Sequence, residues 1–279
     1  GEPSMSPDFW KLMDWWKENP DCTVPFAVNS NLGQKKQLLD ALIESSKSFK
    51  DFSIYTSNEA TELQSEYIRY GLDWDVWMTN MRRVNSEGNI RSVNVMMTIN
   101  SLCLFSITDF MDEMIKLKKE FGPHAAVMSF NILRFPSFQS IVTLPTEIRM
   151  ERAQHMEDWL EKTWDGGSNG FMDMERDGLL RLIEYTRQVD SGHAFTSSKE
   201  SRERDFKSFY IQYDIRRKKD FLKTFPMLKE WWNTIPETNI KQLSDVIDGD
   251  DAKSNKYVED VLKQAKEEGW ILNPQWANP

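Results

Sequence analysis

The fold is decided by residues 93–133, which read VNVMMTINSLCLFSITDFMDEMIKLKKEFGPHAAVMSFNIL. Residues 93–99 are rich in β-branched residues and methionine, which favours a strand. Residues 107–121 carry apolar side chains at helical spacing, and residues 125–133 again favour a strand. A strand, a helix and a second strand in direct succession predict a parallel pair joined by a right-handed crossover.

The same alternation extends toward the amino terminus. Strands are expected over residues 23–28 and around Phe52 and Ile54, and helices from Ser6-Pro7-Asp8, over 38–43, over 60–70 and over 74–81. Strands separated by helices predict an α/β fold, with either an open parallel sheet or a partial barrel. Residues 1–143 are therefore expected to form the first domain.

The pattern changes after Pro145, where strand signals end. Helices are expected from Thr146 through Trp164, around Leu179 and Ile183, from Ser197 through Tyr210, at Trp231-Trp232 and over 255–268. Residues 144–279 are therefore expected to form a mostly helical second region that acts as a cap.

Composition limits the class of protein. The chain has 279 residues, 39% of them hydrophobic and 12% aromatic, which suffices for a packed core. A formal net charge of −9 does not attract nucleic acid over the whole surface. No apolar run approaches the ~20 residues that cross a bilayer. We expect a soluble, cytoplasmic protein that binds neither membranes nor nucleic acid, and its two separated cysteines fit a reducing compartment.

Polar residues follow each expected strand. These strand ends are Asn29–Asn31, Ser57–Glu59, Asn100 and Asn131. Because the carboxyl ends of parallel strands meet at one edge of the sheet, ligands bind there in α/β folds. The alternative is that each side chain only caps a turn or a helix, as Ser and Asn often do.

Several motifs resemble those of a known enzyme family. Gly1-Glu2-Pro3 is similar to the GGEP motif of radical S-adenosylmethionine (SAM) enzymes. The stretches 66–72, 131–136, 213–217 and 224–226 are similar to segments of twitch-domain radical SAM proteins of phages and marine bacteria. The resemblance extends over roughly residues 1–235 and implies a partial (β/α) barrel of the radical SAM type, followed by the helical region.

This resemblance implies a chemistry and its cofactors. A [4Fe–4S] cluster, held by the cysteines of a CxxxCxxC loop, chelates SAM and cleaves it reductively to a 5′-deoxyadenosyl radical. That radical abstracts hydrogen from a substrate, which here would be a small molecule or a peptide. Electrons would come from a donor such as flavodoxin or ferredoxin.

The resemblance also implies which residues contact SAM. Gly1, Glu2 and Pro3 would face its amino group, and Arg69 would pair with its carboxylate through two hydrogen bonds. Ser57 and Glu59 would contact the ribose hydroxyls. The remaining implied contacts are Asn29, Asn31, Asn100, Asn131 and Leu133, with Leu133 and Phe135 beside the adenine.

One departure from the family pattern is decisive. The chain has no CxxxCxxC motif, and Cys22 and Cys103 lie outside the position where that loop belongs. We expect the motif upstream of Gly1, so that the chain is part of a longer enzyme and is inactive alone. No cysteine follows Cys103, which argues against an auxiliary cluster. The alternatives are a barrel homologue that lacks a cluster and works as a binding or scaffold protein, and a likeness that is accidental.

Other clusters have simpler interpretations. Trp15-Trp16 and Trp231-Trp232 are expected in the core rather than against a substrate. The basic segment 199–223 favours a solvated helix face over a site for phosphate or an acidic peptide. Residues 248–251 lack the glycine and glutamate of a calcium loop, and the three scattered histidines receive no catalytic role.

Overall fold

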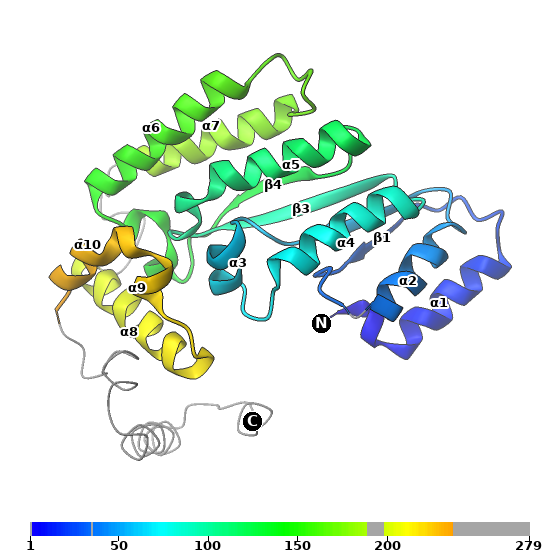
Figure 1. The fold of residues 1–279 in the computed structure, drawn as a ribbon, viewed down its shortest axis with the longest axis horizontal. Helices are drawn as coiled ribbons and strands as arrows, with labels where there is room; N and C mark the ends of the chain where they lie inside the picture. Colours follow the sequence, from blue (N-terminus) through cyan, green and yellow to red (C-terminus); the bar gives the residue numbers. More distant parts are fainter. Residues whose placement is uncertain (1, 35, 189–197, 237–279) are drawn as a thin grey trace. The chain divides into compact units, whose positions relative to one another are not determined.

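The computed structural model describes residues 2–34, 36–188 and 198–236, and its contacts divide the chain into two compact units (Figure 1). The first unit comprises Gly1–Lys199 and the second Glu200–Pro279. The expected helix over 255–268 and the acidic segment 248–251 lie outside the described residues. Among the described residues, none of the helices combines the length and the apolar composition needed to cross a membrane.

The first unit is built on a four-stranded parallel sheet. Its strands are β1 (Phe26–Asn29), β2 (Phe52–Thr56), β3 (Ser92–Ile99) and β4 (Val127–Ile132), in the spatial order β1-β2-β3-β4. The predicted α/β class is confirmed, and each of these strands falls where the sequence indicated one.

Helices connect and flank these strands. The first unit contains α1 (Pro7–Glu18), α2 (Lys36–Ser46), α3 (Glu62–Ile68), α4 (Trp74–Glu87), α5 (Ile107–Phe121), α6 (Thr146–Thr163) and α7 (Asp173–Arg187). Short 3-10 turns add η1 (Pro3–Met5), η2 (Cys103–Phe105), η3 (Ser137–Gln139) and η4 (Ile141–Thr143). Helix α5 has the predicted bounds because Gly122, at φ 103°, ends it in a conformation that other residues rarely adopt.

The two faces of the sheet differ in character. Val28, Ile54 and Val95 lie on the buried face, and the Trp77 indole of α4 reaches Thr56 on that face through a 3.1 Å hydrogen bond. Asn29 and Thr98, which alternate with these residues, are exposed. Right-handed crossovers between consecutive neighbouring strands place all connecting helices on one face, which explains the asymmetry.

Helix α7 belongs to the first unit, although the sequence predicted a domain boundary at 143/144. It packs on β4, and a Cβ built on Gly178 would lie 2.8 Å from the Phe130 ring. The boundary between compact units falls instead at 199/200. The sequence indicated a change of pattern at Pro145, but helices that follow a sheet can still pack on its edge strand.

The second unit contains α8 (Lys199–Arg217), α9 (Phe221–Thr224), η5 (Pro226–Leu228) and α10 (Lys229–Thr234). Its core includes Phe206 and the predicted core residues Trp231 and Trp232. Lys207 donates hydrogen bonds to the carbonyls of Trp232 and Ile235 at 3.1 and 2.8 Å, which satisfies the end of α10. In the first unit Trp16 is also buried, whereas Trp15 is 48% exposed, so the core prediction was wrong for Trp15.

A fully buried ion pair joins α5, β4 and α7. Lys118 Nζ lies 2.5 Å from both carboxylate oxygens of Glu175, and both side chains are 0% exposed. The same carboxylate accepts hydrogen bonds from the amides of Met128 at 2.7 Å and Met172 at 2.8 Å. Burial lowers the pKa of Lys118, and the neighbouring Glu175 carboxylate opposes that shift.

We expect Lys118→Met to destabilise the protein by about 3–5 kcal/mol, because it leaves the Glu175 carboxylate buried without its counter-ion. The free energy of unfolding in urea measures the loss. The matched control is Lys116→Met on the same helix, whose ion pair with Glu113 is exposed and should contribute less than about 1 kcal/mol. Equal losses in the two variants would contradict this account, and Lys118→Met combined with Glu175→Gln should recover part of the stability.

Candidate functional site

A cavity of about 550 Å³ lies at the carboxyl ends of β1 and β2. We call it the edge cavity. Among the residues predicted to bind SAM, those that line it are Glu2, Asn29, Asn31, Ser57 and Arg69. Its volume is within the range of small-molecule sites, roughly 300–1,000 Å³.

Glu2 anchors the amino-terminal segment at the cavity. One carboxylate oxygen accepts a hydrogen bond from the backbone amide of Asn31 at 2.9 Å, and the other accepts one from the Ser4 hydroxyl at 3.1 Å. Pro3 begins η1 and does not line the cavity, and Gly1 is outside the described residues. The cavity wall at β1 therefore depends on a contact between residues 29 positions apart.

The end of β1 supplies polar groups of two kinds. Asn31 uses its side-chain oxygen to accept a hydrogen bond from the Gly33 amide at 2.8 Å, so it shapes the turn. Asn29 is exposed and, within the described part of the chain, its side chain makes no hydrogen bond. The Ser57 hydroxyl after β2 is likewise without a partner among the described residues, so Asn29 and Ser57 can both serve a ligand.

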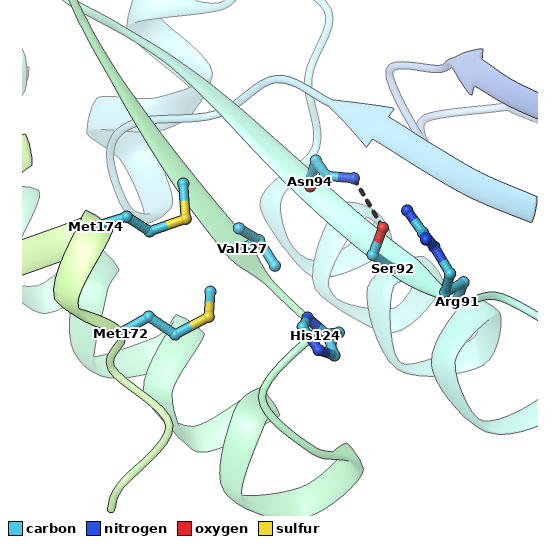
Figure 2. A pocket seen from close by; sticks show the side chains of 7 residues that line it. All are labelled: Arg91, Ser92, Asn94, His124, Val127, Met172 and Met174. Carbon is cyan, nitrogen blue, oxygen red and sulfur yellow. Dashed lines mark hydrogen bonds between the residues drawn. The ribbon is translucent and has the colours of Figure 1, made fainter. Parts of the chain in front are cut away.

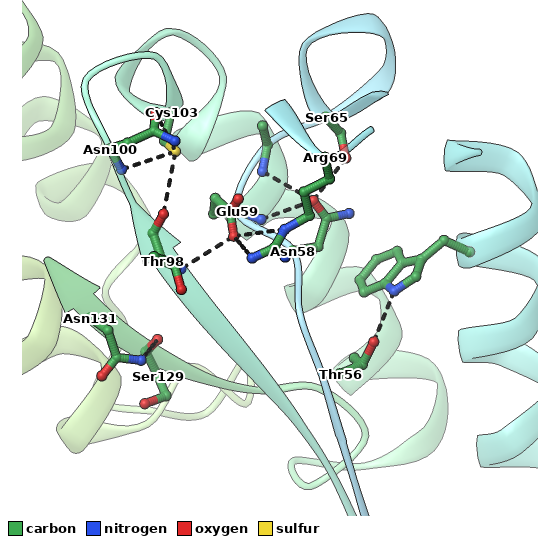
Figure 3. Close-up of polar contacts among 12 residues, drawn as sticks. Thr56, Asn58, Glu59, Ser65, Arg69, Thr98, Asn100, Cys103, Ser129 and Asn131 are labelled. Carbon is green, nitrogen blue, oxygen red and sulfur yellow. Dashed lines mark hydrogen bonds and ion pairs between the residues drawn. The ribbon is translucent and has the colours of Figure 1, made fainter. Parts of the chain in front are cut away.

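Glu59 lies beneath the cavity rather than in it. Its side chain is 2% exposed and forms an ion pair with Arg69, and it accepts a hydrogen bond from the Thr98 amide of β3 at 3.2 Å (Figure 3). Desolvation raises the pKa of Glu59, and the charge and hydrogen bonds of Arg69 counter that rise. The structure thus places Glu59 as the partner of Arg69, away from the position expected of a ribose ligand.

Asn100 and Cys103 form a closed turn after β3. The Asn100 side-chain oxygen accepts a hydrogen bond from the Leu102 amide at 2.9 Å, and the Cys103 thiol lies 3.3 Å from the same oxygen. Burial raises the pKa of the Cys103 thiol well above its usual value, with a further contribution from the Glu59 carboxylate. Asn100 therefore caps a turn, as the simpler interpretation of the sequence proposed.

The predicted contacts on and after β4 do not reach the edge cavity. Asn131 is exposed at the end of β4, and Figure 3 shows it beside Ser129 and apart from Arg69. The backbone amide of Leu133 donates a hydrogen bond to the Ile99 carbonyl at 2.9 Å, and the Phe135 side chain is 72% exposed. β4 is separated from β2 by β3, which keeps these residues away from the ends of β1 and β2.

Sequence reasoning missed the far wall of the cavity. That wall is formed by the segment between α3 and α4, through Tyr70, Gly71, Leu72 and Asp73, with Tyr55 and Trp77 beside it. Asp73 caps α4 by accepting the Val76 amide at 2.9 Å. The sequence signals were the resemblance over residues 66–72, the helix-ending Gly71, at φ 87°, and the Asp cap. None of these signals locates the connection at the site.

The described residues do not fit an iron–sulfur cluster. They contain no group of three or more His, Cys, Asp or Glu side chains placed to hold a metal ion. Cys22 is partly exposed, whereas Cys103 is buried in the turn after β3 with a raised thiol pKa, which disfavours the thiolate that iron requires.

Comparison of the chain with protein-family models, with curated proteins and with solved structures finds no match. Interpretation of the edge cavity therefore depends on its own chemistry and on the sequence motifs.

We expect the stability difference between the wild-type protein and Glu59→Gln to depend on pH. An acid whose folded-state pKa is raised binds more protons when folded, so wild-type stability should fall relative to Glu59→Gln as pH increases above about 4.3, the ordinary value for Glu. Urea unfolding midpoints measured at a series of pH values test this.

The control for this experiment is Glu157→Gln. A hydrogen bond from Arg187 lowers the pKa of Glu157, so the sign reverses and wild-type stability should rise relative to this variant as pH increases. If Glu59→Gln follows the same direction as Glu157→Gln, the attraction of Arg69 outweighs desolvation and the raised pKa of Glu59 is wrong.

Proposed function

We propose that the chain is part of a radical SAM enzyme and that the edge cavity binds SAM. The observation that carries this proposal is the convergence of Glu2, Asn29, Asn31, Ser57 and Arg69 on one cavity. These residues come from segments far apart in the sequence, and the family resemblance named each of them as a SAM contact.

The fold is compatible with a partial (β/α) barrel, which is the finer class we propose. Parallel strands in consecutive order, with their helices on one face, are the arrangement from which such barrels are built. The opposite face carries exposed polar residues, as the inner wall of an open barrel would. A doubly wound sheet would instead reverse its strand order and cover both faces.

We assign the residues of the edge cavity to different chemical groups of SAM. Glu2, already oriented by Asn31 and Ser4, presents a carboxylate to the amino group and to the positively charged sulfonium. Asn29 and Ser57 offer hydrogen bonds to the ribose hydroxyls. Arg69 lies at the wall with its guanidinium partly directed to Glu59, so we assign it the SAM carboxylate and assign Glu59 the task of positioning Arg69.

The proposal needs three cluster cysteines that this chain does not contain. In radical SAM enzymes the cluster supplies the electron that cleaves SAM, and the residues described here do not hold that group. A small-molecule or peptide substrate, a flavodoxin- or ferredoxin-like donor and a reducing, cytoplasmic setting remain parts of this proposal.

One observation favours a second candidate function, a non-catalytic SAM-binding protein. Cys22 and Cys103 are both free, and the part of the chain that the structure describes contains no group of side chains that could hold a cluster for the radical reaction. Sequencing the coding region upstream of Gly1 separates the two candidates. Three cysteines in CxxxCxxC spacing would support the enzyme, and a start codon without them would support the binding protein.

We expect Asn29→Ala to weaken SAM binding by about 10-fold, because one hydrogen bond to the ligand contributes about 1 kcal/mol or more. Asn131→Ala is the matched control, since both asparagines are exposed at strand ends but only Asn29 lines the edge cavity. Isothermal titration calorimetry with SAM measures both affinities. Equal effects of the two substitutions, or none, would refute the assignment of the cavity.

A further inference from the structure

A second cavity lies where β3 and β4 begin. It has a volume of about 340 Å³ and is lined by seven residues, namely Arg91, Ser92, Asn94, His124, Val127, Met172 and Met174 (Figure 2). Asn94, which lines this cavity, is the direct cross-strand partner of Tyr55, which lines the edge cavity, so the two cavities lie close together along the sheet. They have no lining residue in common. We call the second cavity the methionine cavity.

The walls of the methionine cavity are chemically divided. Val127, Met172 and Met174 supply an apolar side, and Met174 is 60% exposed although it belongs to a well-packed helix. Figure 2 shows Arg91, Ser92, Asn94 and His124 on the side away from the methionines. None of the lining residues is acidic, although acidic residues outnumber basic ones in the whole chain, 44 to 35.

The methionine cavity is held in shape by contacts that do not involve a ligand. Glu175, whose carboxylate is fixed by buried Lys118, accepts the Met172 amide at 2.8 Å and so positions the start of α7. On the opposite side, the Ser92 hydroxyl donates a hydrogen bond to the Ser53 hydroxyl at 3.0 Å. The side-chain amide of Asn94 donates one to the Ser92 hydroxyl, also at 3.0 Å. The walls are therefore preformed, which lowers the cost of binding a ligand.

The side of the methionine cavity that carries Arg91 and His124 has nitrogen atoms available to bind an anion. The Nε atom of Arg91 pairs with Asp51 at 3.0 Å, and within the described residues its two terminal nitrogens make no further ion pair. The His124 backbone carbonyl accepts the Val93 amide at 2.9 Å, while its imidazole is exposed and has no hydrogen-bond partner among the described residues. A guanidinium with two available nitrogens matches the geometry of a carboxylate.

We propose that the methionine cavity binds a small carboxylic acid with an aromatic group, with the ring against the methionines and the carboxylate at Arg91 and His124. Thioether sulfur makes favourable contacts with aromatic rings, and the flexible methionine side chain adapts to their shape. A volume of about 340 Å³ is at the small end of ligand sites, so a ring system with a short acid group fits and a nucleotide does not.

The test uses 2-naphthoate as the probe and protein labelled with ¹³C at the methyl groups of its 14 methionines. The expected result is a saturable shift of two methyl signals, which Met172→Leu and Met174→Leu assign. Signals that shift at other methionines, or no saturable shift up to the solubility limit of the probe, would overturn the proposal.

Two comparisons test the carboxylate contact. Arg91→Ala should weaken 2-naphthoate binding by about 10-fold, since hydrogen bonds to charged groups contribute about 1.5 kcal/mol or more. Arg82→Ala is the control, because this partly exposed arginine pairs with Glu120 away from the cavity. Replacing the probe by neutral 2-naphthamide should weaken binding to the wild-type protein similarly. Equal binding of the two probes, or no effect of Arg91→Ala, would refute a carboxylate site.

The inference does not depend on the proposed function of the edge cavity. Saturating SAM should not displace 2-naphthoate, because the two cavities have no lining residue in common. Competition between the two ligands would place them in one site and would overturn the proposal, whereas failure of SAM to bind at all would leave it intact.

Discussion

The edge cavity depends on one buried carboxylate, that of Glu59. The backbone of β2 pairs with β3 only as far as Thr56. Beyond that point the Glu59 carboxylate accepts a hydrogen bond from the Thr98 amide of β3. The same carboxylate binds the guanidinium of Arg69 at the end of α3. It therefore fixes the connection from α3 to α4 against the sheet, and this connection is the far wall of the cavity.

A second buried carboxylate has the same role beside the edge strand β4. Glu175 joins Lys118 of α5 to the amides of Met128 and Met172, and so holds α7 against the edge strand β4. Buried ion pairs contribute little net stability compared with apolar packing, because desolvation offsets their attraction. In this protein they define geometry instead, since each one fixes the wall of a cavity.

The sequence predicted the sheet well because its signals are local. Residues 107–121 have helical spacing with a glycine stop, and the strands are short apolar runs between polar ends. It also placed Asn29 and Ser57 together correctly, because carboxyl ends of parallel strands share an edge.

The sequence could not place Asn131, because strand order is not a local property. In the observed order β4 lies three strand spacings from β1, roughly 14 Å. Nor could it reveal that Glu59 turns inward, since that depends on the position of Arg69.

The central claim is that the edge cavity is a SAM site, and a crystal structure of the chain grown with SAM tests it most directly. The account predicts SAM at the ends of β1 and β2, with its amino group toward Glu2 and its ribose toward Asn29 and Ser57, while the Glu59–Arg69 pair stays intact. SAM bound at another position, or a cavity without SAM at a saturating concentration, would contradict the account.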